Sequence, residues 1–349
     1  MIERRLQPGT SRLPAEPAIR EMPTQPGVVL DRWVVVLKPY LNPEVRNDHF
    51  STLRMRTNNP ANPFNSRVVD EFGLPELKGY AAECNEHTKR EIEALPDVLK
   101  VEPEQLYTRC AVQQGATWGL ERISSRAQLA GDPYTYTYRD NASGAGTVAY
   151  VIDTGINDAH EEFERRAGKG PAFVSDGLLT ENDIWGHGTH CAGTIGSRAY
   201  GVAKQASIIG VKVFSDRTGM AWTSDIIKAL EFVLQDVERR DIRGRAVVNL
   251  SLGGGASEAL DGAVASAARH GVVVCVAAGN DRLIPAEDQS PAREPLAITV
   301  GAIDANDNIA DFSSRGRVVD ILAPGVGVNS CWIDGENTSK HLDGTSMAS

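Results

Sequence analysis

The sequence predicts an α/β protein in which a doubly wound, mostly parallel sheet is preceded by a smaller α/β unit. Two observations carry this prediction. From about residue 146, short runs of valine, isoleucine and alanine alternate with longer amphipathic segments, and such apolar runs are typical of strands buried on both faces of a parallel sheet. Before that point, a shorter strand–helix–strand–helix–strand pattern ends near residue 103.

Composition and charge limit the function classes. The chain has 349 residues, of which 41% are hydrophobic and 23% charged, as in a globular protein of one large or a few smaller domains. A net charge of −10 argues against a general nucleic-acid surface. No segment is apolar for long enough to span a bilayer. We therefore expect neither nucleic acid nor a membrane as a partner.

The N-terminal third divides into a leader and a small unit. Residues 1–29 are rich in proline, arginine and glutamate without periodicity, which predicts a flexible leader. The unit that follows is expected to contain strands at 32–38, 79–82 and 97–103 and helices at 42–56 and 85–95. The second of these helices is expected to open at Asn85.

The larger unit alternates strands with helices. Strands are expected at 147–152, 207–214, 246–251, 271–277, 297–302 and 318–322, and helices at 187–197, 223–240 and 257–269. In the helix at 223–240, apolar residues recur at helical spacing and predict a core-facing stripe. In doubly wound folds the chemistry lies at the carboxyl ends of the strands, where Asp153 falls.

The first candidate for chemistry is a serine in the stretch GTSMAS (344–349). A serine that opens a helix lies near free backbone N–H groups and in a positive partial field, which suits a nucleophile whose substrate develops an oxyanion. Taken alone, this stretch is more typical of an ordinary turn with a helix N-cap.

Two other stretches supply the partners that a serine nucleophile needs. In VAYVIDTG (148–155) an apolar run ends at Asp153, and in GHGTHCAGT (186–194) His187 stands between two glycines. Histidine is the usual base for serine, and a buried aspartate fixes its tautomer. Structural alternatives are a strand-end turn at Asp153, a core histidine at His187, and a weak metal-like pair with His190, which lacks the HExxH spacing.

With these residues the chain resembles the subtilisin-like serine proteases, and within them the proteinase K group. The chain order Asp153, His187, Ser346 is the subtilisin order. The resemblance covers about residues 111–349 and is carried by stretches in the family order: VAYVIDTGI (148–156), WGHGTHCAGTIGS (185–197), YGVAK (200–204), VVNLSLGGG (247–255), VAAGND (276–281), SPAREP (290–295), DILAPG (320–325) and GTSMAS (344–349).

The resemblance implies a serine endopeptidase that forms an acyl-enzyme. Ser346 is the implied nucleophile, His187 the base, Asp153 its orienting partner and Asn280 the oxyanion-hole amide. Implied polypeptide-binding edges are Ser251, Leu252 and Gly253 on one side and Gly219, Met220 and Ala221 on the other, with Trp222 at an outer subsite and Ala277–Gly279 as the pocket floor. Selectivity is expected to be broad, with a preference for apolar or aromatic side chains.

The resemblance also implies a self-processed zymogen. Residues 30–110 resemble the ferredoxin-like inhibitor prodomain of subtilases, through GYAAECNEHTKREIEALPDVLKVEPEQ (79–105), and residues 111–349 form the catalytic domain. Autoprocessing is expected between Cys110 and Ala111. The prodomain would then act as an intramolecular inhibitor, and the enzyme is expected to be a monomer.

Calcium is the one cofactor that the resemblance implies. The matching ligands are the carbonyls of Pro295 and Ala297 and the carboxylate of Asp320, a donor set that suits Ca²⁺. The alternative for Asp320 is a hydrogen-bonded carboxylate within a strand. Cys191, one helical turn after His187, is expected to be a buried thiol beneath the histidine and to make the enzyme sensitive to mercurials.

Three features depart from the family. The first residues lack the apolar core of a secretory signal, although family members are mostly extracellular. The five cysteines are odd in number and the disulfides of the proteinase K group look absent, which would suit a reducing compartment. The chain ends three residues after Ser346, so we expect a domain truncated at its C-terminal end. The alternatives are an inactive subtilase that binds or inhibits proteases through residues 30–110, and an intracellular processing protease.

Overall fold

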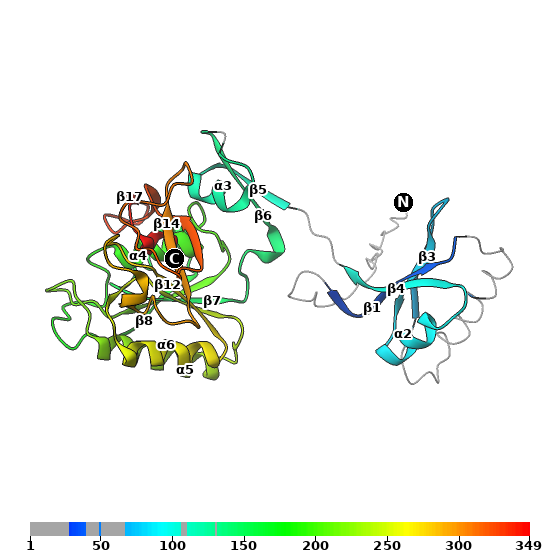
Figure 1. Cartoon of the computed structure of the whole chain (residues 1–349), viewed down its shortest axis with the longest axis horizontal. Coiled ribbons are helices and arrows are strands. Elements are labelled where there is room, and N and C mark those ends of the chain that lie inside the picture. Colours follow the sequence, from blue (N-terminus) through cyan, green and yellow to red (C-terminus); the bar gives the residue numbers. More distant parts are fainter. Residues whose placement is uncertain (1–27, 40–48, 50–66, 106–109, 130) are drawn as a thin grey trace, which may run out of the picture. The chain divides into compact units, whose positions relative to one another are not determined.

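A computed structural model describes residues 28–39, 49, 67–105, 110–129 and 131–349 of the chain (Figure 1). It divides into two compact units, residues 1–107 and 108–349, whereas the sequence placed the boundary after residue 110. Apart from His49, the predicted helix at 42–56 lies outside the described residues, as does nearly all of the predicted leader. No described helix combines the length and the apolar character needed to cross a bilayer.

The first unit is an antiparallel sheet with a helix packed on it. Its elements are β1 (Val28–Leu37), β2 (Arg67–Gly73), β3 (Lys78–Glu83), α2 (Glu86–Glu93) and β4 (Val98–Gln105). The strand order β2-β3-β1-β4, with all neighbours antiparallel, is that of a ferredoxin-like sheet. As expected, α2 opens at Asn85, whose side chain accepts the Thr88 N–H at 2.9 Å.

The second unit is built on a seven-stranded parallel sheet in the order β15-β14-β12-β10-β7-β9-β8. Its strands are β7 (Val148–Asp153), β8 (Ala167–Ala172), β9 (Ser207–Lys212), β10 (Ala246–Leu250), β12 (Val272–Ala277), β14 (Ile298–Ile303) and β15 (Ile321–Pro324). All six strands that the sequence predicted for this unit are present, with ends that differ by a few residues, and β8 was not predicted. The doubly wound α/β class is thereby confirmed.

Helices cover both faces of this sheet (Figure 1). They are α4 (His187–Gly196), α5 (Thr223–Arg239), α6 (Glu258–Arg269) and the short α7 (Thr345–Ala348). One core joins the predicted stripe of α5, including Leu230 and Val233, to α6 and the central strands. A second core on the other face contains Cys191 of α4 and Met347 of α7. Both faces of the strands are therefore buried, which explains their unbroken apolar runs.

Smaller elements surround this frame. They are β5 (Cys110–Ala116), α3 (Trp118–Ser124), β6 (Tyr134–Arg139), β11 (Gly254–Gly255), β13 (Gln289–Ser290), β16 (Val328–Cys331), β17 (Ser339–Leu342) and the 3₁₀ turns η1 (Asp140–Ala142), η2 (Glu161–Phe163) and η3 (Ala286–Asp288). The expected processing point lies in β5, where Cys110 pairs with Arg139 and Ala111 with Tyr138 of β6. All five cysteines are free.

Candidate active site

Three adjacent strands bring the polar residues of the site to one edge of the sheet. Asp153 is the last residue of β7, Ser251 follows the end of β10, and Asn280 lies just past β12. Because β12, β10 and β7 are neighbours and parallel, their carboxyl ends meet at the same edge. The strand order changes direction on either side of β7, which is where doubly wound folds place their sites.

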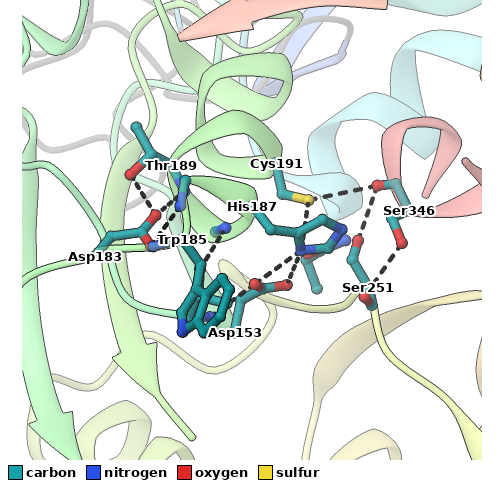
Figure 2. A network of polar contacts seen from close by, with 12 residues as sticks. Asp153, Asp183, Trp185, His187, Thr189, Cys191, Ser251 and Ser346 are labelled. Carbon is teal, nitrogen blue, oxygen red and sulfur yellow. Dashed lines mark hydrogen bonds and ion pairs between the residues drawn. The ribbon is translucent and has the colours of Figure 1, made fainter. Parts of the chain in front are cut away.

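Asp153 and His187 form the central pair of the site (Figure 2). Nδ1 of His187 lies 2.8 and 2.9 Å from the two carboxylate oxygens of Asp153, which is fully buried. The carboxylate also accepts the Thr154 N–H at 2.7 Å. An ionised carboxylate can only accept, so Nδ1 carries the proton and donates it, and the second ring nitrogen of a neutral His187 is left as an acceptor.

Two glycines allow the helix that carries His187 to reach Asp153. A Cβ at Gly188 would lie 2.3 Å from the carbonyl oxygen of Gly155 and 3.1 Å from Cβ of Asp153, so a larger residue would push α4 away from β7. Gly186 has φ +86° and lies against the ring of Trp332, 2.6 Å from where a Cβ would be. Close packing therefore explains why a glycine stands on each side of His187 in the sequence.

Asp183 holds the start of α4, a role that the sequence analysis missed. Its Oδ1 accepts the N–H groups of Trp185 and Gly186 at 3.0 and 2.8 Å, and its Oδ2 accepts the N–H and hydroxyl of Thr189 at 3.0 and 2.7 Å. Gly186 has no side chain to cap the helix, so Asp183 does this from the preceding loop. The only local signal was an aspartate shortly before a helix start.

The charge of Asp153 favours the protonated form of His187. Burial opposes a charged ring, but the negative charge of Asp153, the neighbouring Cys191 sulfur and the hydrogen bonds to both together outweigh that effect and raise the pKa of His187 well above its usual value. The other histidine of this helix behaves in the opposite way. Burial lowers the pKa of His190 to about 4, so this ring is neutral at physiological pH.

Ser346 lies on α7 and faces the His187 ring from the opposite side to Asp153 (Figure 2). It is 7% exposed, and its hydroxyl donates to the Ser251 carbonyl at 3.2 Å. Its own carbonyl accepts the Ser251 hydroxyl at 2.9 Å and the Cys191 thiol at 3.6 Å. The Ser346 backbone is thus tied to the end of β10 and to α4.

The Asn280 amide is oriented by Thr345, the residue before Ser346. Its Oδ1 accepts the N–H and the hydroxyl of Thr345 at 2.9 and 2.8 Å, which leaves the two Nδ2 protons for another acceptor. A Cβ on Gly344 would lie 3.6 Å from this Nδ2, so the amide nitrogen faces the turn that carries Ser346. The role of Thr345 in holding this amide was not apparent from the sequence.

The two expected peptide-binding edges differ in exposure. Ser251 and Leu252 are buried, and Gly253 is exposed. The opposite edge is a closed loop in which Ser215 N–H donates to Met220 O, and Gly219 N–H donates to Ser215 O, both at 2.9 Å. On this edge Ala221 is half-buried, whereas Met220 and Trp222 are 71% and 58% exposed. Of the expected pocket floor, Ala277 and Ala278 are buried and Gly279 is half-buried.

A buried ion pair lies at the start of the loop at 215–220. The sequence analysis did not predict it. Lys212 and Asp216 are 2% and 6% exposed, and their charged atoms lie 2.7 Å apart. The Lys212 ammonium also donates to the carbonyls of Thr154 and Asn182 at 2.7 and 3.1 Å. This cation therefore connects the loop after Asp153 with the segment before His187 and with the peptide-binding rim.

Two groups could hold a metal ion. Asp153, His187 and Cys191 each offer one ligand atom, all within 4.8 Å of one another, and the buried thiol lies 4.0 Å from His187 Nδ1. At the expected calcium site, Asp320 Oδ2 accepts the Thr299 N–H at 2.8 Å, and the Asp320 N–H donates to Thr299 O at 2.9 Å. This reciprocal pair holds the carboxylate beside the segment that contains Pro295, which is exposed, and Ala297, which is buried. These oxygens are of the kind that Ca²⁺ prefers, and calcium binding here stays a prediction.

Comparisons with known proteins show which chains are similar to this one. The model of the subtilase family matches residues 144–349. Alkaline serine protease ver112 of Corniculantispora psalliotae is 46% identical over 274 residues, 78% of this chain and 69% of that protein. The cuticle-degrading protease of Metarhizium anisopliae is 39% identical over 98% of this chain and 82% of its own length. The crystal structure of a cold-adapted subtilisin-like serine proteinase is similar with a TM-score of 0.60 and 44% identity, over 67% of this chain and 81% of that one.

Proposed function

Because the chain belongs to the subtilase family of serine proteases, we propose that it is an endopeptidase whose catalytic triad is Asp153, His187 and Ser346. One observation carries the proposal. Both carboxylate oxygens of the buried Asp153 lie within 2.9 Å of His187 Nδ1, and Ser346 faces the same ring from the other side (Figure 2). This arrangement supports a serine that is activated by a fixed histidine tautomer.

In this mechanism Ser346 Oγ attacks the carbonyl carbon of the substrate while the free ring nitrogen of His187 takes its proton. Asp153 stabilises the imidazolium that forms. The oxyanion accepts hydrogen bonds from Asn280 Nδ2 and from the Ser346 N–H in the first turn of α7. When the intermediate collapses, the C–N bond breaks and His187 protonates the leaving amine. Water then attacks the acyl-enzyme by the same proton path and regenerates Ser346.

The proposed substrate is an extended polypeptide. Gly253 and the loop at Gly219 present backbone with little side-chain obstruction, so a peptide can pair with both edges as an added strand. The residues of the expected pocket floor, Ala277, Ala278 and Gly279, have no side chain larger than a methyl group themselves, which leaves room above them for a substrate side chain. The broad apolar or aromatic preference expected from the sequence is part of this proposal.

The proposal extends to processing, calcium and location. Residues 30–110 would act as the inhibitory prodomain and be cut between Cys110 and Ala111. The ferredoxin-like strand order of the first unit supports this role. Calcium bound by Asp320 and the carbonyls of Pro295 and Ala297 would supply structural stability and no chemistry. We propose an extracellular, monomeric enzyme by analogy with the family.

The test is labelling with a fluorophosphonate probe, which reacts with activated serines. We expect the wild-type chain to be labelled, Ser346→Ala to be unlabelled, and the exposed Ser124→Ala control to label like wild type. Asn280→Ala should label slowly and lose roughly 10²–10³-fold in kcat, the magnitude known for the oxyanion amide of subtilisin. The proposal would be contradicted if Ser346→Ala were labelled as strongly as wild type. It would also be contradicted if neither wild type nor any variant were labelled, and that result would favour an inactive protein with a binding or inhibitory role.

A further inference from the structure

A cavity of about 430 Å³ lies between the edge strand β8 and the C-terminal half of α5. On the strand side it is lined by residues 166–171 and 207–209, and on the helix side by Phe232, Asp236, Arg239 and Arg240. None of these residues belongs to the site described above, which lies at the carboxyl ends of β7, β10 and β12. A volume of this size is typical of small-molecule sites in proteins.

The small residues of β8 keep this cavity open. The strand has the sequence AGKGPA, with glycine at positions 168 and 170. Gly168 lines the cavity, and a Cβ built on it would meet no heavy atom within 4 Å. Its φ is not positive, so the backbone conformation does not require glycine there. Glycine inside a strand often marks a place where a ligand approaches the backbone closely.

Basic side chains dominate the lining of the cavity. One acidic residue, Asp236, lines it together with four basic residues, which are Arg166, Lys169, Arg239 and Arg240. Because the whole chain has a net charge of −10, this concentration of positive charge is a local feature. Outside the cavity, Asp158 lies 3.0 Å from Lys169. Glu164, also outside it, lies 3.6 Å from Arg166. Both carboxylates are partly exposed, and ion pairs of this kind contribute little.

The two arginines at the end of α5 share a single carboxylate. Arg240 Nε lies 2.7 Å from Asp236 Oδ2, and the Arg239 guanidinium contacts the other oxygen. The Tyr150 hydroxyl also donates to Oδ2, at 2.7 Å. Burial opposes ionisation of Asp236, but these hydrogen bonds outweigh it and lower the pKa of Asp236 below its ordinary value. Each guanidinium has more N–H donors than this shared carboxylate can accept, so both arginines can bind a second anion.

We propose that this cavity binds a small phosphate monoester that has an apolar body. The phosphate lies between Arg239 and Arg240, because guanidinium forks match pairs of phosphate oxygens. The Arg239 side chain is 72% exposed, so a ligand can enter at this end. The apolar body lies against Phe232 and Ile209, two half-buried side chains of the lining. A phosphate monoester has a charge of about −1.5 to −2 at neutral pH, which suits this excess of cations. The site is independent of the proposed protease function.

The alternative is that the basic residues only protect the edge of the sheet. Within the described sheet β8 pairs with β9 alone, and lysine and proline on an edge strand discourage pairing with another chain. That role requires Lys169 and Pro171 but no cavity. A binding site, in contrast, requires the open space at Gly168, and it favours a ligand that has both a charge and an apolar body.

The experiment is calorimetric titration of the full chain with phenyl phosphate and with inorganic phosphate, in the Ser346→Ala background to prevent self-digestion. We expect phenyl phosphate to bind roughly tenfold more tightly or better, because its ring buries apolar surface. Gly168→Trp, which fills the cavity, should abolish binding of phenyl phosphate, and Arg239→Gln should weaken it roughly tenfold. The matched control is Arg243→Gln, which removes an exposed cation that follows the same helix but does not line the cavity, and which should leave binding unchanged.

If Gly168→Trp does not fold, as judged by its melting curve, Gly168→Leu narrows the same space and should also weaken binding of phenyl phosphate. Equal affinities for the two phosphates, or unchanged binding in the Gly168 variants, would show that the cations attract anions without a cavity site, and would overturn the proposal. Failure of phenyl phosphate to bind the Ser346→Ala chain would overturn it as well. Labelling of Ser346 by the fluorophosphonate probe is a separate measurement, so the protease function can stand when this inference fails, and the reverse.

Discussion

At the scale of single residues, His187 must be neutral to take a proton, yet its surroundings favour the charged ring. The carboxylate of Asp153 that fixes the tautomer also stabilises the imidazolium. This is the condition for catalysis, because the imidazolium exists in the transition state and is stabilised there. The cost is that His187 of the free enzyme stays protonated, and cannot act as a base, until the pH exceeds its raised pKa.

This cost predicts the pH dependence of the enzyme. Because the pKa of His187 is raised, activity is lost as the pH falls through a value above 6.5, and is fully present only at more alkaline pH. The measurement is kcat/KM against pH with a peptide that has no ionisable group. His190 does not contribute, since its pKa lies at about 4. A midpoint at or below 6.5 would show that the charge of Asp153 does not dominate.

At the scale of elements, the proposed mechanism depends on how closely α4 approaches the end of β7. The N–H of Gly188 donates to the Thr154 hydroxyl at 2.8 Å, so the helix start and the strand end are joined directly. The absence of a side chain at Gly188 is what permits this bond. Small residues in this helix therefore serve contact between elements, although they lower its intrinsic helix propensity.

Gly188→Ala is expected to disable the enzyme and destabilise it. The added methyl group would overlap the Gly155 carbonyl, and overpacking of this kind costs about 1–3 kcal/mol. We expect loss of most kcat and a lower melting temperature. The matched control is Gly262→Ala in α6, where a Cβ meets nothing within 4 Å, and which should stabilise by about 1 kcal/mol. Similar behaviour of the two variants would refute the close-approach argument.

How far the sequence predicts these elements depends on their surroundings. The central strands have long apolar runs because helices cover both their faces, so periodicity finds them. The edge strand β8, AGKGPA, pairs on one side only and has glycine, lysine and proline where a buried strand has valine, so it was missed. The candidate triad of Asp153, His187 and Ser346 was predicted from local motifs. Asp183, Thr345 and Lys212 act through contacts that only the fold creates.

At the scale of the whole molecule, calcium would join segments that are distant in sequence. Asp320 stands just before β15, the edge strand of the sheet, and Pro295 and Ala297 stand just before its neighbour β14. An ion at this point would tie the edge strand to the rest of the sheet. It would bind the folded chain alone, because the unfolded chain does not bring these oxygens together, and would therefore stabilise it by mass action.

We therefore expect calcium to raise the melting temperature, measured in the Ser346→Ala background to prevent self-digestion. Saturation at a hundred times Kd corresponds to about 2.7 kcal/mol. Asp320→Asn should abolish this response, because it removes the only charge among the proposed ligands. Asp311→Asn controls for loss of a carboxylate, since its side chain is 98% exposed and lies 3.6 Å from Arg282 in a surface ion pair. If calcium stabilises Asp320→Asn as much as Asp311→Asn, the ion does not bind at β15, and the Thr299 hydrogen bond is the whole role of Asp320.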